Sequence, residues 1–372
     1  MHQLKQETNE LIKKLYFSLS ELPDRNSVQS LEYNLSKCIY ETEELIQSLK
    51  KAIADRDNQA IEELYRRRAI LKRIADGLAW KIFNYDPTLI KAFSIGHTTG
   101  FMANKKGYMA ERNLVAALYK FDKVEMAIQC DITNILLMGD VIATMQNGEI
   151  RPFEVKGTMD SRSRRQREKA QQIMDFANTG EYSKAMPGFA PLRSFKAQIT
   201  YKHYWDKLVE LSRISIKQGE MVFEILDDSV LFFVGLDLDE MRILQTLQQY
   251  NWTRDQCFSS RLSSHISRQK EILPKTSFPL TIFPIDPAIC LEFLLGNIDA
   301  FIVLNHKVLM EQVKKSNLQI VQENSVFDIL TETGIKFSII DAWDRVLDEL
   351  VTVPSFIEYL VASAQKIEQE YK

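Results

Sequence analysis

Three charged residues on two neighbouring strand-like runs are the feature of this sequence best suited to chemistry. Asp140 lies in the aliphatic run 135–145, and Glu154 and Lys156 lie in the run 150–156. An Asn-Gly pair stands between the two runs, and this pair is the strongest short-range indication of a β-hairpin. Because side chains alternate along a strand, Glu154 and Lys156 should share one sheet face, where Asp140 of the paired strand can meet them.

Two carboxylates and an ammonium on one sheet face suit metal-assisted hydrolysis. Carboxylate oxygens of Asp140 and Glu154 would form a hard site for Mg²⁺ or Mn²⁺, which the backbone carbonyl of Val155 can complete. A metal held there polarises a phosphoryl oxygen and lowers the pKa of a bound water. Lys156 can orient that water or stabilise charge in the transition state. The pattern therefore favours cleavage of a phosphodiester.

Two further acids precede the hairpin. Residues 101–121 are predicted to be a helix, and its expected buried side consists of Ala110, Leu114, Ala117, Leu118 and Phe121. Glu111 on this helix can project toward the hairpin. Asp131 is a competing acid, but its neighbours Thr133 and Asn134 favour a turn residue over a metal ligand.

A basic segment follows the hairpin directly. Residues 151–217 contain 14 Lys/Arg and 7 Asp/Glu, whereas the whole chain has a net charge of −3. A helix is predicted to begin near residue 161, and its first turns carry several cations. Cations are unfavourable at the positive N-terminal end of a helix dipole. The positive charge therefore indicates contacts with phosphate groups. The residues expected to bind nucleic acid are Arg162, Arg164, Arg165, Arg167, Lys169 and Gln171.

The remaining chain divides around this centre. Residues 1–85 show helical periodicity throughout, and residues 86–100 are predicted to form a loop-rich link. Residues 218–372 alternate strand-like and helical runs, with 278–286 among the strand candidates. We therefore expect a helical region 1–85, a central domain 86–217 and a separate α/β region 218–372.

The central motif resembles that of the PD-(D/E)xK nuclease superfamily, which has the restriction-endonuclease-like fold. The matching residues are Gly139-Asp140, Glu154-Val155-Lys156 and a glutamate on the preceding helix, Glu111. The resemblance covers roughly residues 100–202. It implies an α/β fold with an αβββαβ core, in which Asp140 and Glu154 hold Mg²⁺ or Mn²⁺. It also implies that Lys156 assists the attacking water and that Glu111 is the acid of the first core helix.

Other implications of the resemblance are looser. Gln171 or Lys169 corresponds to a polar residue on the helix after the third strand, and the first motif lacks the proline of the family name. The resemblance predicts a nuclease that acts on DNA rather than RNA, with a role in restriction or anti-phage defence. The flanking regions 1–85 and 218–372 would then serve target choice, association with a second copy or another protein, or activation.

Composition narrows the setting. No apolar run is long enough to span a bilayer. The four cysteines lack metal-ligand spacing, which favours free thiols in a reducing cytoplasm. Two other functions stay open: a nucleic-acid-binding protein on a nuclease fold that has lost catalysis, and a regulatory or interaction subunit of a defence or repair complex.

Overall fold

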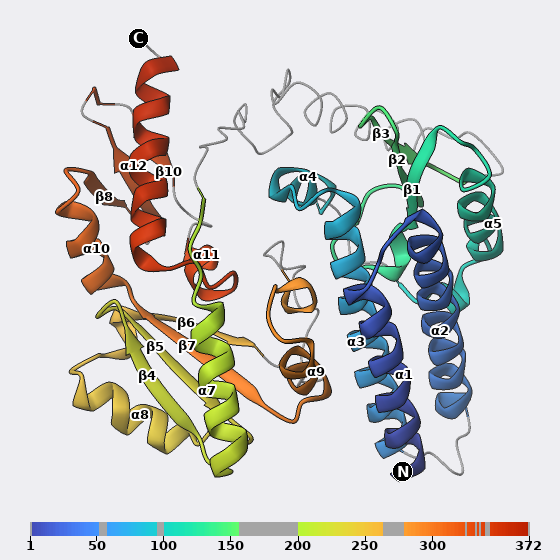
Figure 1. Ribbon diagram of the computed structural model, residues 1–372, viewed down its shortest axis with the longest axis horizontal. Coiled ribbons are helices and arrows are strands. Elements are labelled where there is room, and N and C mark those ends of the chain that lie inside the picture. The colour runs from blue at the N-terminus through green and yellow to red at the C-terminus, as the bar shows by residue number, and fades with distance from the viewer. Residues whose placement is uncertain are drawn as a thin grey trace. The chain divides into compact units, whose positions relative to one another are not determined.

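A computed structural model describes nine stretches of the chain, and they fall into two compact units. The described stretches are residues 2–51, 58–94, 100–155, 200–262, 279–323, 326–331, 333–334, 336–338 and 343–370. Described residues up to 155, together with 279–282, form the first unit, and the others form the second. N-terminal helices and antiparallel sheets make this a mixed α/β structure (Figure 1).

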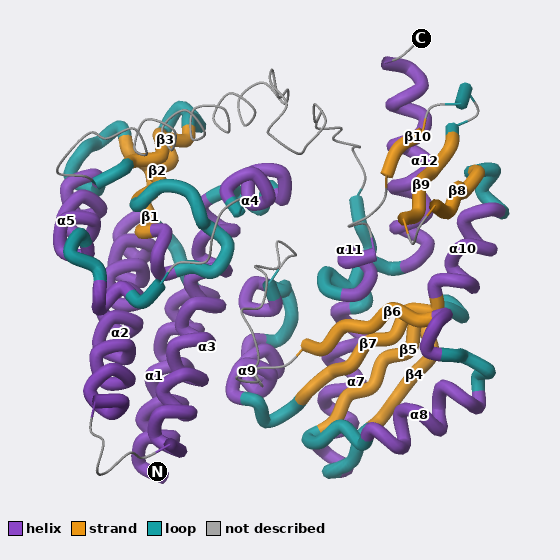
Figure 2. The backbone as a smooth tube through the Cα atoms, turned by 180° about the vertical axis from the view of Figure 1, so that it is seen from behind, coloured by secondary structure: helices purple, strands orange, loops and turns teal. Residues whose placement is uncertain are grey.

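The first unit joins a set of long helices to a small sheet (Figures 1 and 2). Its elements are α1 His2–Ser20, α2 Arg25–Lys51, α3 Asn58–Ile82, α4 Pro87–Phe93, η1 Met102–Asn104, α5 Tyr108–Leu118, β1 Val124–Gln129, η2 Cys130–Ile132, β2 Val141–Met145, β3 Ile150–Phe153 and η4 Leu280–Ile282.

Helical periodicity explains how α1, α2 and α3 pack. On α2 the buried apolar positions follow spacings of three and four residues, as in Val28, Leu31, Leu35 and Ile39. The three helices lie side by side, and α2 and α3 also contact β1. Arg25 joins α2 to the end of α5 by donating hydrogen bonds to two backbone carbonyls there, at 2.7 and 2.9 Å.

The small sheet has the strand order β1-β2-β3, and both pairings are antiparallel. Val141 pairs with Phe153 and Thr144 with Ile150, so β2 and β3 form the predicted hairpin. Gly148 closes the turn, with φ +80° and a hydrogen bond from its N–H to the carbonyl of Met145 at 2.8 Å. The middle strand β2 is almost entirely buried, which fits its β-branched and aliphatic sequence.

The strands are shorter than the sequence suggests, and this changes the place of the acids. Residues 135–140 are not in β2, because Gly139 adopts φ +82° and turns the chain immediately before the strand. Strand β3 ends at Phe153, so Glu154 follows the strand rather than lying in it. Asp140 and Glu154 therefore occupy the ends of paired strands.

Two local predictions in this unit were wrong. The segment 86–100, predicted to be a loop-rich link, is helical over Pro87–Phe93, because Pro87 opens α4 after Asp86, whose carbonyl accepts from the N–H of Ile90 at 3.2 Å. The buried face of α5 consists of Tyr108, Glu111, Val115 and Leu118, whereas Phe121 is exposed. Hydrogen-bonding partners allow the polar Glu111 to take a buried position that the apolar pattern assigned to other residues.

The second unit is built on a four-stranded antiparallel sheet of order β4-β5-β7-β6, with a separate three-stranded sheet β10-β9-β8. Its elements are α7 Trp205–Gln218, β4 Val222–Leu226, β5 Val230–Gly235, α8 Glu240–Gln249, η3 Arg254–Gln256, β6 Cys257–Leu262, α9 Pro287–Leu295, β7 Asp299–Asn305, α10 His306–Lys314, β8 Gln319–Glu323, β9 Val326–Leu330, β10 Lys336–Ser338, α11 Trp343–Leu347 and α12 Val353–Glu370.

Both faces of the larger sheet are covered. Phe233 of β5 packs with Ile243 and Leu247 of α8 in one apolar cluster. Phe232 points to the opposite face, where its ring lies edge-on to Tyr204 at 5.5 Å, just before α7. This explains why β5 is buried along its whole length rather than alternating.

The division of the chain differs from the expected one at two places. The helical region 1–85 and the β1-β2-β3 sheet belong to one unit, and α7 belongs to the other. The strand predicted at 278–286 is instead the short helix η4 followed by irregular chain. None of the helices among the described residues combines the length and apolar character needed to cross a membrane.

Candidate functional site

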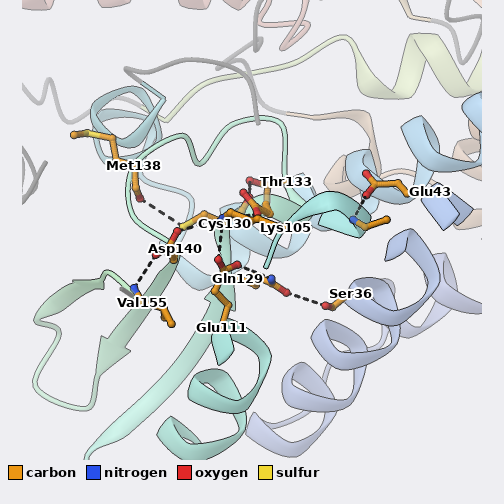
Figure 3. Close-up of polar contacts among 12 residues, drawn as sticks. Ser36, Glu43, Lys105, Glu111, Gln129, Cys130, Thr133, Met138, Asp140 and Val155 are labelled. Atoms are coloured by element: carbon orange, nitrogen blue, oxygen red, sulfur yellow. Dashed lines mark hydrogen bonds and ion pairs between the residues drawn. The ribbon is translucent and has the colours of Figure 1, made fainter. Parts of the chain in front are cut away.

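Asp140 directly precedes β2, the middle strand of the small sheet, and lies at one end of that sheet (Figure 3). Its N–H donates to the carbonyl of Phe153 and its carbonyl accepts from the N–H of Cys130, each at 2.9 Å, so its backbone is fixed on both sides. Its Oδ2 accepts the N–H of Val155 at 2.7 Å, and its Oδ1 lies 3.2 Å from Nζ of Lys105. The backbone group that Val155 presents to Asp140 is thus its N–H.

Glu111 reaches the same place from α5. Its Oε1 lies 2.8 Å from Nζ of Lys105, and its Oε2 accepts from the side-chain amide of Gln129 at 2.9 Å. The side chain is only 2% exposed. Burial raises the pKa of Glu111, and the hydrogen bonds from Lys105 and Gln129 oppose that rise.

Lys105 and Asp131 complete the site. Nζ of Lys105 lies 2.7 Å from Oδ2 of Asp131, in addition to its contacts with Glu111 and Asp140. Burial alone would lower the pKa of Lys105, but the hydrogen bonds and charges of Asp131 and Glu111 outweigh it and raise that pKa above its usual value. Lys105 is therefore an ammonium bound by three carboxylates. We call Glu111, Asp131 and Asp140 the acid cluster.

Sequence reasoning found part of this arrangement. Glu111 and Asp140 were expected to meet, and they share one ammonium. Asp131 lies in the turn-like helix η2, as expected of a turn residue, yet its carboxylate also enters the cluster. Lys105 was not foreseen, because one of two adjacent lysines before a helix has no distinguishing pattern.

The N-terminal helices hold the loops that carry these residues. Glu43 of α2 accepts from the N–H of Ala103 at 3.1 Å, which fixes the segment before Lys105. Asp76 of α3 accepts from the backbone N–H of Asn134 at 2.7 Å and from its side-chain amide at 2.8 Å. These contacts fix the loop after Asp131, so the helical region acts as a support for the site.

The hydrogen bonds between α3 and the loop after Asp131 are largely buried. Lys72 of α3 donates to the carbonyl of Thr133 at 3.1 Å. Burial lowers the pKa of Lys72 to about 8 and raises the pKa of Asp76 to about 6. Lys72 and Asp76 are only 3% and 7% exposed, so both groups have lost much of their hydration and need their partners.

Gln129 links the acid cluster to α2. Its Oε1 accepts from the hydroxyl of Ser36 at 2.8 Å, which orients its amide nitrogen toward Glu111. Its backbone N–H donates to Oε1 of Glu32 at 3.2 Å. Burial raises the pKa of Glu32 to about 7, and the hydrogen bond from Gln129 opposes the rise. A continuous polar layer therefore runs from α2 to Glu111.

A sequence pattern does mark this layer. On α2 the apolar positions Val28, Leu31, Leu35 and Ile39 define a stripe, and Glu32 and Ser36 occupy the same stripe. A carboxylate on an apolar stripe requires a buried partner. That mismatch is visible in the sequence alone.

Among the remaining acidic and basic residues expected at the site, the structure describes only Glu154. Glu154 follows β3 and is half-buried. The residues that lie outside the described part of the chain are Lys156, Arg162, Arg164, Arg165, Arg167, Lys169 and Gln171.

The donors of the acid cluster are chemically suited to a hard divalent cation, because all are carboxylate oxygens. Their present arrangement is directed at Nζ of Lys105. Within the stretches that the structure describes, no group of three or more His, Cys, Asp or Glu side chains is arranged to hold a metal ion. The donor type fits Mg²⁺ or Mn²⁺, whereas the geometry shown is that of an ion-pair cluster.

Comparisons with protein-family models, with curated proteins and with solved structures find no match to this chain.

Proposed function

We propose that the first unit is a metal-dependent nuclease domain that hydrolyses phosphodiester bonds of DNA. One observation carries the proposal: Glu111 on α5 and Asp140, directly before the middle strand, both contact the ammonium of Lys105. The element order α5-β1-β2-β3 supports the proposal, because it is the order of the αβββ part of the core that the resemblance implies.

In this proposal Asp140, Glu154 and Glu111 would hold Mg²⁺ or Mn²⁺, with the backbone carbonyl of Val155 as a further donor. When bound, the ion would polarise a phosphoryl oxygen and increase the acidity of a water. Lys156 would orient the attacking water and stabilise developing negative charge. The basic residues Arg162, Arg164, Arg165, Arg167 and Lys169, with Gln171, would bind the phosphate backbone of the nucleic acid.

The fixed backbone of Asp140 supports a catalytic role for its carboxylate. Hydrogen bonds on both sides of this residue, and a third from Val155 to its carboxylate, limit the positions that the side chain can adopt. A group held in this way loses little entropy when it engages a substrate. A place in restriction or anti-phage defence is the biological role proposed for such a nuclease, with the helical region and the second unit serving target choice or activation.

A second candidate function rests on Lys105. Its ammonium already neutralises part of the charge of the acid cluster, as it would in a nuclease-fold protein that binds nucleic acid without cleaving it. In that case Asp140 and Glu111 would be structural. A regulatory or interaction subunit would show the same behaviour in a cleavage assay.

The test is cleavage of circular and linear DNA and RNA by the purified chain with Mg²⁺ or Mn²⁺. We expect Asp140→Asn and Glu111→Gln each to lower the cleavage rate by about 100-fold or more, as for groups that bind or orient a metal. Asp239→Asn, at a helix start in the second unit, is the matched control and should cleave like the wild type. Cleavage that persists in Asp140→Asn, or no cleavage of any substrate by folded wild type, would contradict the nuclease proposal.

A further inference from the structure

The ammonium of Lys105 stands where the carboxylates of the acid cluster meet. Its nitrogen lies 2.8 Å from Glu111, 2.7 Å from Asp131 and 3.2 Å from Asp140. Glu111 lies on α5, Asp131 lies in η2 and Asp140 directly precedes β2, so the contact joins three separate segments of the chain. Figure 3 shows Glu111 and Asp140 close to Lys105. A cation that binds the same oxygens must take the position of this nitrogen.

The three acids and Lys105 differ in exposure to solvent, and this difference allows a metal ion to replace the ammonium. The side chains of Glu111, Asp131 and Asp140 are 2%, 6% and 15% exposed, whereas that of Lys105 is 38% exposed. The acids are thus largely buried, whereas the side chain that carries the ammonium is partly exposed to solvent. A lysine side chain has several rotatable bonds and a strongly hydrated head group, so it can move out without a change in the backbone.

The backbone around Lys105 is held independently of its side chain. Its N–H donates to the carbonyl of Met102 at 2.8 Å, and Ala103 is bound by Glu43. The acid cluster also retains attraction for a further cation, because three carboxylates can bear three negative charges against the single positive charge of Lys105.

We infer that Lys105 is the resident counter-ion of the acid cluster and that a divalent cation binds there only by displacing its ammonium. This inference rests on the proposed function, because Glu111 and Asp140 belong both to the acid cluster and to the proposed metal site, and Lys105 would control the metal affinity of that site. Lys105 is a positioning residue in this scheme: it holds the acids in place before the cation arrives. Displacement of Lys105 would explain why carboxylates of the kind that bind Mg²⁺ or Mn²⁺ surround an ammonium in this structure.

The experiment measures Mn²⁺ binding by calorimetry to the full chain, without nucleic acid. We expect Lys105→Met to bind Mn²⁺ roughly tenfold or more tightly than the wild type, since one charge at ion-pair distance shifts a neighbouring ionic equilibrium by about that much. Lys106→Met alters the adjacent exposed lysine and should bind like the wild type. The double variant Lys105→Met with Asp140→Asn should lose the gain.

Two results would overturn the inference, and they separate it from the proposed function. Equal Mn²⁺ affinity of wild type and Lys105→Met would refute displacement and leave a metal-dependent nuclease intact. No Mn²⁺ binding by either folded protein would refute displacement and metal dependence together.

A measurement on the wild type covers the case in which Lys105→Met does not fold. The side-chain nitrogen of Lys105 can be followed by NMR during a Mg²⁺ titration. We expect its signal to shift in a saturable way, and Asp140→Asn to abolish the shift. Saturable Mg²⁺ binding with an unchanged Lys105 signal would overturn the inference.

Discussion

Two groups of acids in this molecule are used in different ways: the acid cluster of the first unit and two helix caps of the second unit. In the first unit, Glu111 and Asp131 are buried and share the ammonium of Lys105 with a third acid. In the second unit, Asp239 and Asp286 lie at helix starts and accept backbone N–H groups of their own helices. Both kinds of acid flank apolar strands or helices in the sequence, so residue type alone does not distinguish them.

The difference lies in the number of elements that meet at each acid. A capping carboxylate satisfies N–H groups two or three residues away, and a local pattern is enough to place it. The acids of the acid cluster have their partner Lys105 on a separate segment, and they are partly dehydrated by the packing of α5 and the small sheet. Convergence and burial therefore distinguish the acid cluster from a helix cap.

The largest effect that tests this difference is expected at Glu32. Burial raises the pKa of Glu32 from 4.5 to about 7, so its contribution to stability is present below pH 4.5 and is lost as pH rises through about 7. Glu32→Gln should remove this loss. The free energy of unfolding of Glu32→Gln, compared with that of the wild type, should be roughly 3 kcal/mol more favourable at about pH 8 than below pH 4.5. One pKa unit corresponds to about 1.4 kcal/mol.

Urea unfolding of both proteins at acidic and alkaline pH measures this gain. Glutamine keeps an oxygen that can accept the N–H of Gln129, so the contact itself is preserved. Glu10→Gln, on the exposed side of α1, is the control and should show no such pH dependence. A stability difference between Glu32→Gln and wild type that is independent of pH would mean that Glu32 is not dehydrated as the structure shows.

Local patterns were sufficient for the elements that carry the site. The Asn-Gly turn and the β-branched runs predicted the hairpin, and helical spacing predicted the N-terminal helices and a helix bearing Glu111. Patterns of this kind depend on neighbours in the chain. They overextended the strand before Asp140, because the positive φ of Gly139 has no counterpart in hydrophobicity.

The partners of the acids could not be predicted in the same way. Lys105 and Asp131 meet only because β1 pairs with β2 and α5 packs on that sheet. Gln129 contacts Glu111 only because its amide is oriented by a hydroxyl on α2. These contacts join residues far apart in the sequence, and a single sequence contains no record of their distances.

A smaller effect is expected at Gly139, where the comparison can be made with a matched glycine. Gly139 and Gly219 have φ values of +82° and +71°, which L-residues rarely adopt. An alanine at either position should lower the free energy of unfolding by about 1–2 kcal/mol. Only Gly139→Ala should also weaken Mn²⁺ binding and cleavage, because it alone adjoins Asp140. Equal Mn²⁺ affinities of the two variants would mean that the turn at Gly139 does not position Asp140.

The smallest effect is expected at the cap of α8, and it separates charge from geometry. Asp239 accepts the N–H groups of Met241 and Arg242 at 2.9 and 3.1 Å. Asp239→Ala should lower the free energy of unfolding by about 1 kcal/mol, with faster hydrogen exchange confined to α8. Asp239→Asn should differ from the wild type by only a few tenths of a kcal/mol, because asparagine and aspartate cap equally well.

The same change to asparagine at Asp140 should disable cleavage, because the proposed role there requires a negative charge as well as an oxygen. A capping site depends on the position of an acceptor atom, whereas an ion-binding site depends on the charge that it carries. If Asp239→Asn were as damaging as Asp239→Ala, charge would matter at the cap too. If Asp140→Asn were silent, the acid cluster would be a structural ion-pair network, and it would then serve the fold alone, as the helix caps do.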